Sequence, residues 1–427
     1  MSVPPDAVST GGPPWAPGYR HLTAGVPSVS FRTRERPEDF FVEELPHAPA
    51  AGEGTHLLLT VEKRALSTTA AVRRLAAALG RRDAEFGYAG RKDARAVARQ
   101  RISIEHADPA RLRALDVPGL TLLGIERTTR KLRLGDLAGN RFRIVLRGLG
   151  EGERGRVEEV LDVLRRRGLP NWVGAQRFGR AGQAWELGRA LVAGDPEAYV
   201  AALVSAAHAE PSAARSELER VLAEGSWSER RGLASLARDL EPDLARLARQ
   251  AARRPKDAAS MVRAIPRATR RFHVSALQSR VFNRVLARRL AEGAWDAAEA
   301  GDVVRHHATG SSEVVGPGGP SGRILRSVGD LAASPTGPLP GRRRLAHLGR
   351  PARWERAAVE EEGLDLDALL ALGDGLAPGG DRRPLRIPLG DVSLSFREAS
   401  CTLGFVLPPG SFATAVLEEL AKDHGEG

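Results

Sequence analysis

The chain has 427 residues, enough for two or three domains, and its 64 Lys and Arg against 53 Asp and Glu give a net charge of +11. A single cysteine, Cys401, excludes a disulfide framework and a thiolate zinc site. The N-terminus lacks the apolar segment of a signal peptide, and the longest apolar stretch, 198–209, is too short to span a bilayer. We therefore expect a cytoplasmic protein with no membrane segment and no bound metal.

The positive charge is concentrated in one part of the chain. Residues 61–147 hold 20 Lys and Arg against 9 Asp and Glu, a surplus of 11 that equals the surplus of the whole chain. Arginine side chains bind phosphates through a planar fork and can stack on bases. The charge therefore indicates a polyanionic partner, and we expect it to surround the site where that partner binds.

The first part of the chain predicts a mixture of strands and helices. Residues 1–17 are rich in Pro and Gly and predict a disordered tail. In 140–147, Phe142, Ile144 and Leu146 alternate with arginines, which is typical of an antiparallel sheet with one polar face. The expected elements are strands at 56–63, 100–105, 120–125 and 140–147, and a helix at 67–79 that Ser67 caps and Gly80 ends.

The remainder predicts a helix-rich region followed by a return to strands. Residues 156–250 are largely helical, and 274–290 predict a long helix capped by Ser275. Gly, Pro and Ser predict loops at 308–322 and 333–341. A helix at 364–372, strands at 385–388, 392–396 and 402–407, and a final helix from about 412 complete the order. We expect an α+β fold, with a mixed or antiparallel sheet and a helix-rich insertion.

The stretch with the strongest chemical signal is FGYAGRKDARAVARQ, residues 86–100. Asp93 lies in a glycine-containing loop between Arg91, Lys92 and Arg95, so its carboxylate is biased to stay ionised and to act only as an acceptor. The residues alone allow two interpretations. The carboxylate either neutralises local repulsion, or it is catalytic at the bottom of a groove that binds a polyanion.

Six segments in order resemble the TruD family of tRNA pseudouridine synthases. The first four are RPEDFFVE at 36–43, the Asp93 motif at 86–104, RKLRLGDLAGNRFRIVL at 130–146 and PNWVGAQRFG at 170–179. The last two are SALQSRVFNRVLARRL at 275–290 and LPPGSFAT at 407–414. The resemblance implies isomerisation of uridine to pseudouridine, characteristically at position 13 in the D-arm of tRNA, without a cofactor. By motif match Asp93 is the catalytic aspartate, which either attacks the sugar or removes a proton from it.

The resemblance also implies residues that bind the substrate. A base flipped from its stack needs an aromatic face and a polar group for its Watson–Crick edge, and Phe142 and Asn140 match these roles. They lie two apart on a predicted strand and so share one side of the sheet. Simple core packing is the alternative for Phe142. Phe40 and Phe412 match aromatic positions of the uridine pocket, whereas Phe41 is expected in the core.

Arg34 matches a basic position of the family. It could pair with Asp93 and keep that carboxylate charged and oriented. The alternative is an exposed arginine of the N-terminal segment. The QRFG residues Gln176, Arg177 and Phe178 are expected to brace the structure rather than to act on the substrate.

By resemblance, residues 18–166 and 379–427 form the catalytic domain and 167–378 form the family's insertion domain. We expect a monomer that acts on tRNA and needs no protein partner. Two alternatives stay open at this point. The chain could be a non-catalytic RNA-binding protein or RNA chaperone on the same fold, or a pseudouridine synthase that modifies another RNA.

Overall fold

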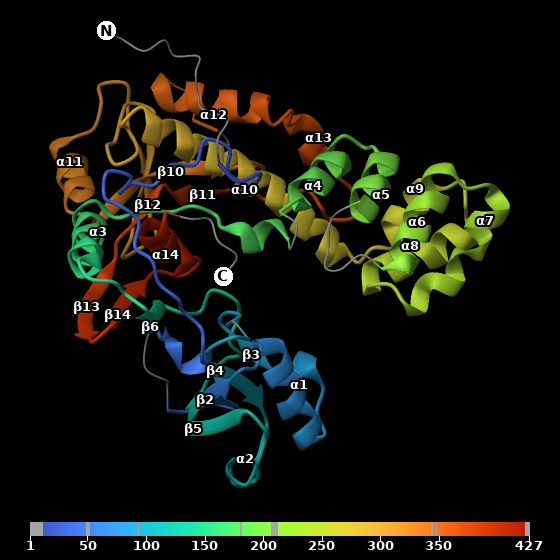
Figure 1. Ribbon diagram of the computed structural model, residues 1–427, viewed down its shortest axis with the longest axis horizontal. Coiled ribbons are helices and arrows are strands. Elements are labelled where there is room, and N and C mark those ends of the chain that lie inside the picture. The colour runs from blue at the N-terminus through green and yellow to red at the C-terminus, as the bar shows by residue number, and fades with distance from the viewer. Residues whose placement is uncertain are drawn as a thin grey trace. The chain divides into compact units, whose positions relative to one another are not determined.

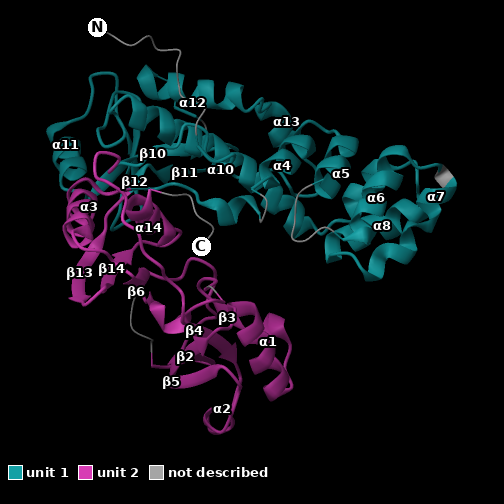
Figure 2. Ribbon diagram, in the orientation of Figure 1, with its two compact units in different colours: residues 1–22, 170–386 teal, residues 23–169, 387–427 magenta. Residues whose placement is uncertain are grey.

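A computed structural model describes residues 12–47, 52–92, 94–179, 182–205, 212–342, 345–346 and 348–422. It forms two compact units, shown in Figure 2. Unit 1 comprises Met1–Leu22 and Pro170–Arg386, and unit 2 comprises Thr23–Leu169 and Ile387–Gly427. Residues 170–386 of unit 1 are thus inserted into unit 2, where the predicted insertion was 167–378. Residues 18–22, predicted in the catalytic domain, belong to unit 1.

Unit 2 is built on a mixed sheet of eight strands among the described residues, in the order β13-β14-β6-β1-β4-β2-β5, with β3 also paired to β4. All pairs are antiparallel except β1 with β4. The strands are β1 (Phe40–Leu45), β2 (His56–Arg64), β3 (Gly87–Tyr88), β4 (Val97–Glu105), β5 (Leu120–Thr128), β6 (Gly139–Arg147), β13 (Gly390–Arg397) and β14 (Ser400–Leu407). The helices are η1 (Pro37–Asp39), α1 (Thr68–Leu79), η2 (Asp83–Glu85), α2 (Pro109–Arg113), α3 (Glu153–Arg167) and α14 (Thr414–Ala421).

One face of this sheet is covered by helices at both ends. At one end α1 packs beside β2 and β4 (Figure 1), where Val72 and Leu75 join Leu59 and Ile102 in one apolar cluster. At the other end α3 contacts β13 and α14. The middle strands β4, β1 and β6 lie between these helices. Side chains that point to this face from the middle strands are therefore available for a site.

The predicted strands and helices of unit 2 are confirmed. The helix predicted at 67–79 is α1, whose N-terminus is capped by Ser67: its Oγ accepts the Ala70 N–H at 3.1 Å. Gly80 ends the helix with φ 67°, a left-handed conformation that favours glycine. In β6, Phe142, Ile144 and Leu146 are buried as the alternation predicts.

Unit 1 is mostly helical and is organised around the long helix α10 (Arg267–Ala291), with α12 (Gly349–Glu361) lying alongside it in Figure 1. A small sheet has the order β11-β10-β8-β9. Its strands are β8 (Val303–His306), β9 (Ser312–Val314), β10 (Ala333–Leu339) and β11 (Asp381–Pro384). The other helices are η3 (Ala175–Phe178), α4 (Ala184–Val192), α5 (Pro196–Ser205), α6 (Ala213–Glu224), α7 (Trp227–Gly232), η4 (Leu233–Arg238), α8 (Pro242–Arg253), α9 (Ala258–Ala264), α11 (Gly322–Gly329) and α13 (Leu366–Ala371). Two short strands, β7 (Leu169–Pro170) and β12 (Arg386–Ile387), lie where the chain passes between the units.

The prediction of a disordered tail is wrong for residues 12–17. Trp15 and Ala16 are buried in the core of unit 1, and the Trp15 ring stacks on Phe178 at a centroid distance of 5.8 Å. Residues 1–11 lie outside the described residues. The aromatic side chains in this Pro/Gly-rich segment supply the burial that its composition did not predict. The same contact gives Phe178 the bracing role expected of it.

Three local predictions in unit 1 are also wrong. The predicted loop at 308–322 contains the short strand β9, which pairs with β8. The long helix begins at Arg267, after Pro266, so Ser275 lies inside α10, where its Oγ donates to the Phe272 carbonyl at 2.9 Å. The predicted loop at 333–341 contains strand β10 despite its two prolines. Residues 333–335 pair with β8 and residues 336–339 with β11. Because each half pairs on one side only, proline is tolerated there as on an edge strand.

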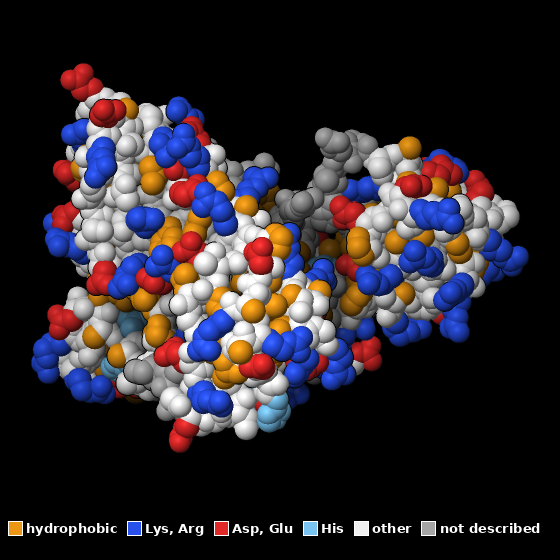
Figure 3. All heavy atoms as spheres, turned by 90° about the horizontal axis from the view of Figure 1, so that it is seen from below, with side chains coloured by type: hydrophobic (Ala, Val, Ile, Leu, Met, Phe, Trp, Pro, Cys, Tyr) orange, Lys and Arg blue, Asp and Glu red, His pale blue; other side chains and the backbone are white. Residues whose placement is uncertain are grey.

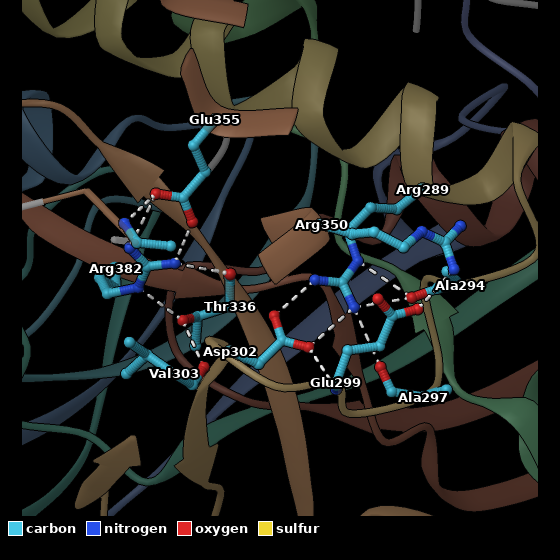
Figure 4. A network of polar contacts seen from close by, with 11 residues as sticks. Arg289, Ala294, Ala297, Glu299, Asp302, Val303, Thr336, Arg350, Glu355 and Arg382 are labelled. Carbon is cyan, nitrogen blue, oxygen red and sulfur yellow. Dashed lines mark hydrogen bonds and ion pairs between the residues drawn. The ribbon is translucent and has the colours of Figure 1, made fainter. Parts of the chain in front are cut away.

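Buried ion pairs connect the small sheet to the helices of unit 1 (Figure 4). Arg382 of β11 binds Glu355 of α12 and donates from Nε to the Thr336 hydroxyl at 2.8 Å. Arg289 of α10 binds Asp302 at 2.6 Å, and these side chains are 1% and 0% exposed. Charged groups that are this buried are found paired, because an unpaired buried charge is strongly destabilising.

Candidate active site

The carboxylate predicted to be catalytic, Asp93, lies outside the described residues, so its role stays a prediction. The residue before it, Lys92, is described and is buried. The remaining predicted side chains all belong to unit 2 and are Arg34, Phe40, Asn140, Phe142 and Phe412.

A partly buried ion pair fixes the turn that precedes Phe40. Asp39 ends the short helix η1 and is 1% exposed. Its carboxylate accepts hydrogen bonds from Arg147 Nη2 at 2.6 Å and Nε at 3.1 Å, and from the Arg36 N–H at 3.0 Å. The hydrogen bonds from Arg147 hold the pKa of Asp39 below its ordinary value. The chain therefore enters β1 in one defined direction, with Phe40 as the first strand residue.

Three aromatic rings gather on the helix-covered face of the middle strands. Phe40 registers with Ile144, and Val42 with Phe142, so Phe40 and Phe142 share that face. Their ring centroids are 6.1 Å apart in an edge-to-face arrangement. Phe142 also stacks on Phe405 of β14, with centroids 5.3 Å apart and planes at 28°. Two of the predicted aromatic residues thus meet, and Phe405 is a third that the sequence reasoning did not identify.

Asn140 lies on the same face, at the start of β6. It registers with Glu44 of β1 and Leu407 of β14. The preceding Gly139 permits this close pairing, because a Cβ there would lie 2.6 Å from the Leu407 carbonyl oxygen. The Asn140 Oδ1 atom is buried and has no hydrogen-bond partner in the part of the chain that the structure describes. A buried amide oxygen without a partner costs about 1–3 kcal/mol.

Arg34 covers the ring of Phe40. Its guanidinium carbon lies 4.3 Å from the ring centroid, in cation–π geometry. The Arg34 backbone has φ 60°, a left-handed conformation that is uncommon for a residue other than glycine. Strained backbone of this kind is often found at functional sites. Since Phe40 and Phe142 are only 4% and 7% exposed, a base can stack on either ring only if neighbouring side chains move.

Phe412 is the predicted aromatic residue for which the described residues show no ring contact with the others. It lies after β14 and two residues before α14 begins at Thr414, and it is half-buried. Within the described ranges no ring contact joins it to Phe40 or Phe142. Phe412 follows the last residue of β14, Leu407, by five residues, and Leu407 registers with Asn140.

The arginines of the middle strands lie on the opposite face of the sheet. Arg99, Arg141 and Arg143 alternate with the residues that face the helices. Phe41 lies among them, half-buried, with Arg99 and Arg143 guanidinium carbons 5.2 and 5.1 Å from its ring centroid. Phe41 is therefore half-buried on the polar face and not a core residue as expected, and the expectation that the charge surrounds the uridine pocket stays a prediction. Lys and Arg are spread over the surface in Figure 3 with Asp and Glu among them.

A buried polar network lies beside the predicted site and was missed by the sequence reasoning. Its centre is the ion pair between Lys92 Nζ and Glu44 Oε2, at 3.2 Å, with side chains 5% and 0% exposed. Burial raises the pKa of the Glu44 carboxyl, and Lys92 opposes that rise. The signal was present in β1, where alternation places Glu44 on the same face as Phe40 and Val42. A charged residue on a buried face of a sheet is rarely found without an oppositely charged partner.

The described residues contain no group of three or more His, Cys, Asp or Glu side chains arranged to hold a metal ion. Among the same residues, every helix is too short or too polar to cross a membrane.

Comparison with known proteins identifies the family. A sequence model of tRNA pseudouridine synthase D (TruD) matches residues 17–420. The tRNA pseudouridine synthases D of Geobacter metallireducens and Geobacter sulfurreducens are 39% and 38% identical to the chain, over 94% and 96% of its length and 98% of each relative. A crystal structure described as tRNA pseudouridine synthase D (TruD) from Methanosarcina mazei has a similar fold, with a TM-score of 0.76 and 25% sequence identity. The match covers 95% of this chain and 97% of that chain. The chain therefore belongs to the TruD family and is a tRNA pseudouridine synthase, an isomerase.

Proposed function

We propose that the enzyme isomerises uridine 13 in the D-arm of tRNA, as a monomer and without a cofactor, and that Asp93 is the carboxylate that starts the reaction. The observation that carries the proposal is the group formed by Phe40, Phe142 and the unpartnered Oδ1 of Asn140 on one face of the middle strands. These side chains offer what a flipped pyrimidine needs, an aromatic surface and a polar group for its edge.

The reaction exchanges one bond to the sugar for another. The C1′–N1 bond breaks, the uracil turns, and C5 bonds to C1′; C5 then loses its proton and N1 gains one. Asp93 starts this sequence either by attacking C1′ or by taking a proton from the sugar at C2′. Asn140 would hold the Watson–Crick edge of the base, and the aromatic rings would support its face while it turns.

Arg34 would act at the entrance to this pocket. Its guanidinium lies over Phe40, so a base that stacks on this ring must displace it. We propose that Arg34 pairs with Asp93 and keeps that group ionised. Phe412, on the segment between β14 and α14, would line the other part of the pocket.

The test uses transcribed tRNA with uridine or cytidine at position 13. The wild-type enzyme should form pseudouridine only in the uridine form, and Asp93→Asn should bind this tRNA nearly as well but form none. An active Asp93→Asn variant would remove Asp93 from the mechanism. A primary isotope effect with deuterium at C2′ would favour proton removal over attack at C1′.

Mapping pseudouridine in cellular RNA with and without the enzyme addresses the two alternatives. Loss of pseudouridine from tRNA position 13 alone supports the proposal. Loss at sites in another RNA would change the substrate. No loss anywhere would favour a non-catalytic RNA-binding protein.

A further inference from the structure

Gln100 of β4 carries a buried hydrogen-bond donor without a partner in the described part of the chain. The residue is 1% exposed, and the unpartnered atom is its side-chain nitrogen, Nε2. Among the described residues, the other unpartnered side-chain amide atom that is buried is Asn140 Oδ1. The two atoms differ in kind, because an amide nitrogen donates hydrogen bonds and an amide oxygen accepts them.

The two amides lie on the helix-covered face of the middle strands, on either side of β1. Glu44 of β1 registers with Asn140 of β6. On its other side β1 pairs in parallel with β4, and there Glu44 Oε1 accepts the Arg101 N–H at 3.4 Å. Gln100 precedes Arg101 and bonds to helix α1, so it points to the same face as Glu44. A donor and an acceptor without partners thus flank β1 on the face that carries Phe142.

The hydrogen-bond pattern fixes which end of the Gln100 amide is the donor. The Thr68 hydroxyl oxygen accepts from the Lys92 N–H at 2.8 Å, and its one hydrogen is donated to Gln100 Oε1, also at 2.8 Å. The reversed amide would leave both the Thr68 hydrogen and the amide oxygen without a partner. Oε1 therefore faces Thr68, and Nε2, on the other arm of the amide, is the group that remains to donate.

We propose that Gln100 Nε2 donates a hydrogen bond to a carbonyl oxygen of the uracil base and so helps to determine specificity for uridine. The inference rests on the proposed binding of the base beside Asn140 and Phe142. Uracil presents an N3–H donor between two carbonyl acceptors, so an amide oxygen and an amide nitrogen match two neighbouring groups of its edge. Because Gln100 is as closed to solvent as Phe142, the side-chain movement that admits the base must also uncover Nε2.

The proposed contact discriminates between pyrimidines. Cytosine has no hydrogen on N3, so Asn140 Oδ1 would stay without a partner. It also has an amino group where uracil has O4, and an amino group cannot accept from Gln100. A site whose buried polar groups are left unpaired by the wrong base rejects that base strongly.

Substrate analogues test the contact atom by atom. A tRNA with 2-thiouridine or 4-thiouridine at the modified position has one uracil carbonyl oxygen replaced by sulfur, a weaker acceptor. With the wild-type enzyme, one of the two analogues should lower kcat/KM about 3- to 10-fold relative to uridine, the range of one hydrogen bond. With Gln100→Met, the same analogue should cost less than about twofold, because the donor is already gone.

Two further variants keep this result interpretable. Gln100→Glu retains the acceptor for Thr68 but has no donor on the other arm, so it should lose the same discrimination if the methionine variant does not fold. Gln278→Met is the matched control. Gln278 of α10 is another buried glutamine, and its Nε2 donates to the Pro340 carbonyl. This control should keep the wild-type ratio of kcat/KM between uridine and each analogue.

The outcomes separate this inference from the proposed function. The analogues are placed at whichever uridine the wild-type enzyme converts, so the test does not depend on position 13. If wild-type and both Gln100 variants have equal ratios for both analogues, the Gln100 inference fails, as it does if Gln278→Met changes the ratio equally. Conversion of another uridine, with the ratio lost in the Gln100 variants, would overturn the proposed position and leave the Gln100 inference standing.

Discussion

The guanidinium carbon of Arg34 lies 4.3 Å from the centroid of the Phe40 ring, on a backbone with φ 60°. The Arg34 guanidinium therefore covers a ring that the proposed reaction uses. Because a cation–π contact contributes only about 0.5–2 kcal/mol, a bound base can displace Arg34.

Arg34→Ala should therefore leave Phe40 more exposed and yet reduce activity. We expect a loss of about tenfold in the single-turnover rate, equivalent to about 1.4 kcal/mol of transition-state stabilisation.

Arg32→Ala is the control for Arg34→Ala. Arg32 lies in the same segment, is paired with Glu35 at 2.5 Å and has a side chain that is 69% exposed. The control removes the same charge and should keep the wild-type rate. Equal losses in the two variants would indicate a general effect of charge on tRNA binding.

Phe142→Leu tests whether the Phe142 ring supports the base or only fills the core. The leucine keeps most of the apolar volume, so the loss of stability should be below the about 3–5 kcal/mol of truncation to alanine. Base–aromatic stacking is worth about 1–3 kcal/mol, so capture of uridine should weaken by roughly 5- to 150-fold. Titration with tRNA and single-turnover rates would measure this.

The comparison variant is Phe405→Leu, in the ring that stacks on Phe142 and is 0% exposed. It alters the same aromatic cluster from the side that the base does not reach in our proposal. At equal loss of melting temperature, Phe142→Leu should lose more activity. The same loss of activity from both variants would support core packing alone.

The local features of the site could be predicted from the sequence because they depend on neighbouring residues. Alternation in 140–147 gave the shared face of Asn140 and Phe142, and the cap at Ser67 gave the start of α1. The motif supplied Phe40 and Arg34 as candidates. None of these needs knowledge of which strands pair.

The features that were missed depend on the register between distant strands. Phe405 meets Phe142 only because β14 pairs with β6, and Glu44 meets Lys92 only through the fold of unit 2. A count of charged residues does not show to which face of the sheet each side chain points. It could therefore not show that Arg99 and Arg143 lie on the face opposite Phe142. Asp93 lies outside the described residues, and its contacts stay untested.

Asn140→Leu should reduce activity without reducing stability. The buried Oδ1 has no hydrogen-bond partner among the described residues, and removal of such an atom relieves a cost of about 1–3 kcal/mol. The melting temperature should be equal to or above that of the wild type. Pseudouridine formation should fall strongly, because the base loses the group proposed to hold its edge.

Asn283→Leu provides the contrast in stability. Asn283 is 0% exposed and its amide bonds to the Val173 N–H and carbonyl, each at 3.0 Å. Its loss should lower the melting temperature clearly. If Asn140→Leu destabilises the enzyme as much, the Asn140 amide has a structural partner, and its assignment to the substrate is weakened.

The ion pair between Asp39 and Arg147 should make stability depend on pH in a defined direction. Hydrogen bonds from Arg147 lower the pKa of folded Asp39, so the pair stabilises the folded state at pH values above the unfolded pKa of about 3.9. This contribution is lost as the pH falls through the folded pKa. Asp39→Asn should cost about 1 kcal/mol at pH 7, at the low end for a charged hydrogen bond because the Arg147 side chain is 32% exposed.

Urea unfolding at several pH values measures this effect. The difference in unfolding free energy between wild type and Asp39→Asn should be constant from about pH 5 to 7 and shrink below about pH 4. Glu35→Gln is the control, because Glu35 lies 3.9 Å from Arg147 Nε and is 42% exposed, and it should show little difference at any pH. Since Asp39 fixes the turn that leads into Phe40, the single-turnover rate of Asp39→Asn should also fall at pH 7. A difference in stability that does not change between pH 7 and pH 3 would contradict the assignment of the pair.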